Sequence, residues 1–122
     1  MTDKLRTTIE KHKKMWEFIK EQEKDCGYIP NVENRFALKS NYLYNYTVDV
    51  EPLNNCYLCE YARRAFINSS ADCMCDCCPC LWGSENERYG FYCEPDEGES
   101  GVCWATSPVD DIINLPIKPE LL

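Results

Sequence analysis

This sequence of 122 residues has one histidine, five glycines and no uninterrupted run of 18 apolar residues. The missing apolar run argues against a hydrophobic membrane span. The first residues, which alternate charged with apolar side chains, lack the apolar core of a secretory signal. The sequence contains no glycine-rich phosphate loop, and its single imidazole shows no Ser-His-Asp or Cys-His arrangement. We therefore expect no membrane contact and no enzymatic activity.

Basic residues are also scarce: the sequence has 13 lysines and arginines against 21 aspartates and glutamates, which gives a formal net charge of −8. Residues 72–111 contain ten acidic side chains and a single basic one, Arg88. Because proteins bind nucleic acid by neutralising phosphates, this balance argues against a nucleic-acid partner. It favours a protein partner with a basic surface, although the acidity could serve solubility alone. The acidic residues that we expect at such an interface are Glu94, Asp96, Glu97 and Glu99.

Ten cysteines are the most distinctive feature of what is present. Cysteine-rich small proteins are either secreted disulfide scaffolds or intracellular metal-binding proteins. The lack of a secretory signal and the dense spacing of these cysteines favour the metal. Neighbouring cysteines bridge poorly, whereas a C-x-x-C turn brings two sulfurs to one ion. A disulfide framework remains the alternative.

The clearest metal motif pairs Cys56-x-x-Cys59 with Cys75-x-x-Cys78, fifteen residues apart. Two such turns can supply four thiolates in a tetrahedron, the closed coordination of structural zinc. Pro79 follows the second turn and restricts its backbone. An iron–sulfur cluster also accepts four thiolates, but the two-plus-two spacing favours zinc. We predict one zinc ion on these four residues.

The other cysteines leave alternatives open. Cys73, Cys77 or Cys80 could replace Cys75 or Cys78 as a ligand. A second zinc ion could be held by Cys77, Cys80, Cys93 and Cys103. The single histidine, His12, lies in the apolar stripe of a predicted helix. We expect it to be a packed or surface side chain rather than a ligand.

Apolar side chains recur at spacings of three and four over residues 2–25, which predicts a helix. A capping box of Thr7 and Glu10 offers a later start, and Gly27 offers a stop, so the N-terminal helix falls within 1–27. Residues 28–40 give weak signals and are expected to form a loop with one short element. The stripe consists of Leu5, Ile9, His12, Met15, Trp16, Phe18 and Ile19.

Residues 41–51 alternate, with Tyr42, Tyr44 and Tyr46 on one face, and predict a β-strand. A short helix should leave the first cysteine turn and end near Asn68, and a hairpin could run through 89–93. The strand and the metal region together span 41–104. Ser107 as N-cap and Pro108 in the first turn predict a C-terminal helix over 107–116.

These elements predict an α+β fold, a single zinc-stabilised domain over 1–122. A long N-terminal helix and a short C-terminal helix should pack on a short β-sheet and the zinc knuckle. The expected core residues are Trp16, Phe18, Tyr42, Tyr44, Leu58, Phe66, Trp82 and Ile112.

Four short motifs resemble small cysteine-knuckle proteins encoded by bacteriophages of Gram-positive bacteria. The motifs are Lys11-His12-x-x-x-Trp16, Cys56-x-x-Cys59-x-Tyr61-Ala62, Cys75-x-x-Cys78-Pro79-x-x-Trp82 and Ile113-x-Leu115-Pro116-x-Lys118. The resemblance implies a phage origin, Cys56, Cys59, Cys75 and Cys78 as zinc ligands, and a location in the cytoplasm of the infected host. The cluster departs from the pattern by adding Cys73, Cys77 and Cys80.

The functional hypothesis is a non-enzymatic, acidic, zinc-binding accessory protein that binds and modulates a bacterial host or defence protein, as an anti-defence inhibitor would. One rival is a nucleic-acid-binding zinc finger that uses Arg63, Arg64, the lysines of the N-terminal helix and the tyrosine row. The other is a metal-dependent nuclease or hydrolase with oxygen ligands such as Asp72 or Asp76, which the cysteine-rich surroundings disfavour.

Overall fold

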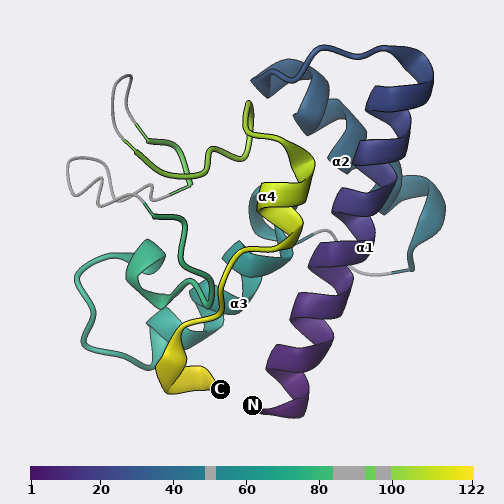
Figure 1. Cartoon of the computed structure of the whole chain (residues 1–122). Coiled ribbons are helices and arrows are strands. Elements are labelled where there is room, and N and C mark those ends of the chain that lie inside the picture. The colour runs from purple at the N-terminus through teal and green to yellow at the C-terminus, as the bar shows by residue number, and fades with distance from the viewer. Residues whose placement is uncertain (49–51, 84–92, 96–99) are drawn as a thin grey trace.

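The fold is built around one long helix, α1, which packs against each of the other three helices (Figure 1). The structure is a computed structural model that describes residues 1–48, 52–83, 93–95 and 100–122. Its α-helices are α1 (Asp3–Cys26), α2 (Val32–Tyr46), α3 (Tyr57–Ile67) and α4 (Val109–Ile113), and its short 3-10 helices are η1 (Leu53–Asn55), η2 (Met74–Cys77) and η3 (Pro119–Leu121).

The ends of α1 follow from local chemistry. The Thr2 side chain accepts a hydrogen bond from the Leu5 N–H at 3.2 Å and caps the helix, so the start at Thr7 is wrong. Gly27 ends α1 in the left-handed region (φ 69°) and donates its N–H to the Glu23 carbonyl at 3.0 Å. The predicted helix over 2–25 is therefore confirmed.

The predicted strand over 41–51 is wrong, and with it the α+β fold class. Residues up to Tyr46 belong to α2, which begins after Asn31, whose side chain accepts from the Asn34 N–H at 2.7 Å. Across the ranges that the structure describes, the only strand-like pairing is an isolated bridge between Cys80 and Ile117. The protein is mainly helical, and 28–40 is largely helix rather than loop. Residues 49–51 and most of the predicted hairpin at 89–93 lie outside the described residues.

The helical face of α2 escaped prediction because two of its buried positions are charged. Arg35 and Lys39 are buried together with Leu38 and Leu43, at helical spacing. Because two of the inward positions carry cations, the apolar residues of α2 show no clear helical period. The alternating tyrosines instead match the two-residue period of a strand. Tyr44 is 88% exposed, so its assignment to the core is wrong.

Most of the other predicted core residues are inside. Trp16, Leu58, Trp82 and Ile112 are buried. Three further aromatic side chains are half-buried, and two of them pack with tilted rings between α1 and α2, with ring centroids 5.3 Å apart. These three are Phe18, Tyr42 and Phe66.

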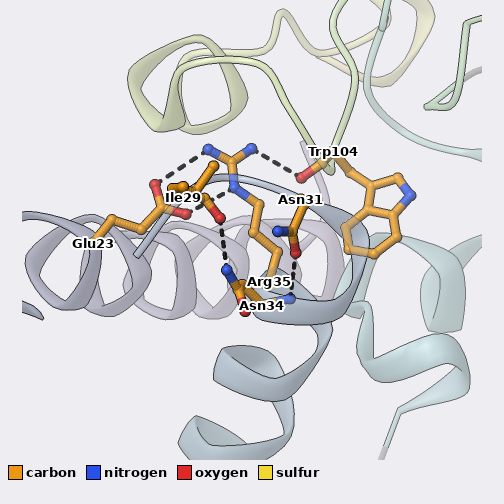
Figure 2. Close-up of polar contacts among 6 residues, drawn as sticks. All are labelled: Glu23, Ile29, Asn31, Asn34, Arg35 and Trp104. Carbon is orange, nitrogen blue, oxygen red and sulfur yellow. Dashed lines mark hydrogen bonds and ion pairs between the residues drawn. The ribbon is translucent and has the colours of Figure 1, made fainter. Parts of the chain in front are cut away.

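Arg35 joins α1, α2 and the segment that precedes α4, as Figure 2 shows. Its guanidinium donates two hydrogen bonds to the Glu23 carboxylate, at 2.9 and 3.2 Å, and a third to the Trp104 carbonyl at 3.1 Å. Its charge also lies over the Trp16 ring, 5.5 Å from the centroid. A fully buried cation is tolerated here because all these partners replace its water.

The last two helices were largely foreseen. The helix after the first cysteine turn is α3, which ends at Ile67, beside Asn68. The C-terminal helix exists but spans only Val109–Ile113. Ser107 does not cap it: its hydroxyl accepts from the Cys103 N–H at 2.7 Å instead. None of the helices in the described ranges is long and apolar enough to cross a membrane.

Candidate metal centre

Cys56 and Cys59 stand at the start of α3. Cys56 is the N-cap, and its sulfur accepts a hydrogen bond from the Cys59 N–H at 3.2 Å. This position lets a helix N-terminus stabilise negative charge on sulfur. The predicted C-x-x-C turn is therefore a helix cap, with both sulfurs on the first turn.

The two thiols differ in acidity. A hydrogen bond from the Cys59 side chain lowers the pKa of Cys56 to about 6, helped by the Lys39 charge and by backbone N–H groups, while burial acts against it. The same hydrogen bond, with burial, raises the pKa of Cys59. The shared hydrogen bond therefore favours the thiolate at Cys56, with Cys59 as the hydrogen-bond donor.

The second predicted turn lies in and after η2, which packs directly on α3. The Cys75 carbonyl accepts from the Cys78 N–H at 3.1 Å, which closes the turn. Burial raises the pKa of Cys78, whose sulfur is hydrogen-bonded by Trp82. Negative charge on Cys56 also raises the pKa of Cys78, so the two residues are close enough to interact electrostatically.

Four of the cysteines line one cavity of about 240 Å³ that also borders α1 and α2. They come from three separate stretches of chain: the start of α3, η2, and residue 93. Lys39 also lines the cavity, donates to the Asn54 carbonyl at 3.2 Å, and lies over the Trp104 ring at 4.6 Å. Its positive charge acts on Cys56 and helps to lower the pKa of that thiol. The four sulfurs belong to Cys56, Cys59, Cys75 and Cys93.

The cavity set overlaps the predicted ligand set without matching it. Cys56, Cys59 and Cys75 are in both, Cys78 lies outside the cavity lining, and Cys93 joins. Within the part of the chain that the structure describes, no group of three or more His, Cys, Asp or Glu side chains is already arranged to hold a metal ion. Zinc binding stays a prediction.

The predicted second set is spread over the molecule. Cys80 is buried in the hydrophobic core, and burial raises its pKa to about 12. The Cys77 sulfur lies 3.7 Å from the Ser69 hydroxyl at the surface. Cys93 faces the first cavity, and Cys103 is half-buried in the loop before α4.

The predicted partner-binding acids are only partly visible. Glu94 is exposed and accepts a hydrogen bond from the Trp104 indole at 2.6 Å. Asp96, Glu97 and Glu99 lie outside the described residues.

The arginines and tyrosines that a nucleic-acid-binding zinc finger would use make other contacts in the fold. Glu60 pairs with Arg63 at 2.6 Å and with Arg64 at 3.4 Å, which occupies both guanidinium groups. The Arg63 hydrogen bond holds the pKa of Glu60 at about 2, so this pair stays charged. The tyrosine row is also lost, because Tyr42 and Tyr46 pack on Phe18.

His12, expected to be a packed or surface side chain, is packed inside and also lines the same cavity. It is 2% exposed, and burial lowers its pKa to about 4, against a hydrogen bond with the Ile112 carbonyl that acts in the other direction. The imidazole is therefore neutral at physiological pH. The helical spacing of His12 in the apolar stripe indicates that it points inward, but it does not indicate which residues it meets there.

Comparison with known protein families, with curated proteins and with solved structures found no match to this chain.

Proposed function

We propose that this protein is a non-enzymatic, zinc-stabilised protein that binds a basic protein partner through its acidic surface. The observation that carries the proposal is the convergence of Cys56, Cys59, Cys75 and Cys93 on one cavity. Three stretches of chain that share no regular sheet meet there. A metal ion at this point would tie them together.

Zinc suits this cavity better than a hard cation. Thiolates are soft ligands that select zinc, whereas magnesium and calcium take oxygen ligands. Cys56 and Cys59 anchor the centre on the α3 turn, and Cys75 supplies a sulfur from η2. In a domain this small, such a centre adds folding free energy that the core alone supplies poorly.

Folding makes the surface more acidic than the net charge indicates. Arg35 and Lys39 are buried, so two of the 13 basic side chains do not face solvent. Among the described residues no aspartate or glutamate is buried. Thiolates bound to zinc would add further negative charge. An excess of exposed carboxylates favours a partner rich in lysine and arginine and accelerates its association.

The bacteriophage resemblance narrows the partner to a bacterial protein. In this proposal the chain acts in the cytoplasm of an infected host. There it binds a host or defence protein whose basic surface would otherwise meet nucleic acid, because carboxylates compete with phosphates for the same cations.

A pull-down with a control in which the acidic residues are neutralised tests the proposal. The bait is the zinc-loaded chain, and the control carries Glu94→Gln, Asp96→Asn, Glu97→Gln and Glu99→Gln together. We expect the bait to capture a specific protein from a Gram-positive lysate at low salt, and the control to capture at least about tenfold less. That protein, purified, should bind the bait directly and lose affinity as salt rises. Equal capture by both baits, or no specific capture, contradicts the proposal.

A further inference from the structure

His12 has one ring nitrogen engaged and one without a partner. Nε2 lies 3.1 Å from the Ile112 carbonyl oxygen in α4. A carbonyl only accepts hydrogen bonds, so Nε2 carries the hydrogen and Nδ1 of the neutral ring carries a lone pair. Nδ1 is buried, and the structure gives it no hydrogen-bond partner. An acceptor buried in this way is energetically costly and calls for a physical reason.

The surroundings of His12 supply a reason. The side chain lines the same cavity as four cysteine sulfurs. The imidazole comes from α1, whereas the sulfurs come from α3, η2 and residue 93. A metal ion in this cavity would therefore find a nitrogen donor on one wall and sulfur donors on the other.

The contact with Ile112 also matches the outer shell of a metal-bound histidine. Histidine ligands nearly always donate their second ring N–H to a carbonyl or carboxylate, which fixes the tautomer and aims the ligating nitrogen. The Nε2 contact with Ile112 provides this, and Nδ1 is the nitrogen left to ligate.

We propose that His12 Nδ1 is a metal ligand, so that the centre is a three-cysteine, one-histidine site made of His12, Cys56, Cys59 and Cys75. Cys56, Cys59 and Cys75 are chosen because α3 and η2 pack directly on each other and their sulfurs line the cavity that His12 lines. Cys78, predicted from the sequence as the fourth ligand, does not line it. This inference rests on the proposed zinc centre and changes its ligand set.

X-ray absorption on the zinc-loaded, full-length chain tests the ligand set without any substitution. We expect three sulfurs at about 2.3 Å, one nitrogen at about 2.0–2.1 Å and the outer scattering of an imidazole ring. A shell of four sulfurs without imidazole scattering would overturn the role of His12 and leave the proposed zinc centre standing. A chain that binds no zinc at all would contradict the zinc centre itself.

Cobalt spectra of three variants give a second, independent reading. With Co²⁺ in place of zinc, His12→Cys should restore four-ligand binding with bands shifted to lower energy, since thiolate is a weaker-field ligand than imidazole. His12→Ala should weaken Co²⁺ binding at least about tenfold, the loss typical of even an outer-shell partner. Cys78→Ser should bind Co²⁺ with an unchanged spectrum. The inference is overturned if Cys78→Ser loses the bands, or if His12→Ala keeps both spectrum and affinity.

Discussion

Arg35 and Glu23 form a two-pronged ion pair, with N–O distances of 2.9 and 3.2 Å, inside the junction of α1 and α2. The Arg35 side chain is fully buried and that of Glu23 is 13% exposed. The third guanidinium contact, to the Trp104 carbonyl, extends this junction to the segment before α4. The Arg35 side chain therefore connects α1 and α2 to the C-terminal half of the chain.

Replacing Arg35 with Met should lower the free energy of unfolding by about 3 kcal/mol. The loss leaves the Glu23 carboxylate and the Trp104 carbonyl in the junction without their cation, and breaking one side of a buried pair costs roughly 3–5 kcal/mol. The remaining exposure of Glu23 favours the lower end of that range. Urea unfolding followed by circular dichroism measures the change.

Arg6→Met is the matched control for that experiment. Arg6 also pairs with an acid, Asp3 at 3.0 Å, but these side chains are 58% and 99% exposed. Exposed pairs contribute about 0–1 kcal/mol, so this variant should unfold almost like the parent. Equal destabilisation by both substitutions would contradict the structural role of Arg35.

Two tyrosine substitutions separate the helix α2 from the strand that the alternating pattern predicts. Tyr42→Ala should cost about 1–3 kcal/mol, because Tyr42 packs on Phe18 and loses both burial and a ring contact. Tyr44→Ala should change stability by less than about 0.5 kcal/mol, since Tyr44 points to solvent. In a strand the two side chains share one face, so equal large losses would support the strand and contradict α2.

Thiol alkylation should distinguish Cys26 from Cys80. Cys26 is exposed at the end of α1, whereas Cys80 is buried with its pKa raised to about 12. At pH 8 only roughly one Cys80 thiol in ten thousand would be the reactive thiolate, and raising the pH toward 12 would increase that fraction. Iodoacetamide labelling mapped by peptide mass spectrometry should modify Cys26 first. Early labelling of Cys80 in folded protein would contradict its burial.

Chelation should loosen the C-terminal half more than the α1–α2 pair. Without zinc, the segments that carry the cavity cysteines lose their common attachment, while the Arg35 contacts remain. Tryptophan fluorescence should shift to the red as Trp82 becomes exposed, the melting temperature should fall, and added zinc should reverse both. Unchanged fluorescence and melting after complete zinc removal would show that the metal has no structural role.

Sequence reasoning succeeded where local signals and burial agree. Thr2, Gly27 and a regular apolar stripe define α1, and the Cys56 turn leads into α3 as expected. It failed at α2 because the inward positions of Arg35 and Lys39 are charged. No local rule shows that the Glu23 carboxylate binds Arg35 or that the Asn54 carbonyl binds Lys39 in the fold. The packed position of His12 follows from its place in the apolar stripe, but the cavity cysteines Cys56, Cys59 and Cys75 lie more than forty positions away, and no local rule shows that they share its cavity.

Native and denaturing mass spectrometry, on protein purified without chelator or reductant, tests the central claim most directly. The account predicts one zinc ion per folded chain, lost on denaturation, and a polypeptide mass equal to that of ten reduced cysteines. A metal-free chain about ten mass units lighter would contradict it, because five disulfides remove two hydrogens each. That result would make the molecule a disulfide scaffold instead of a zinc protein.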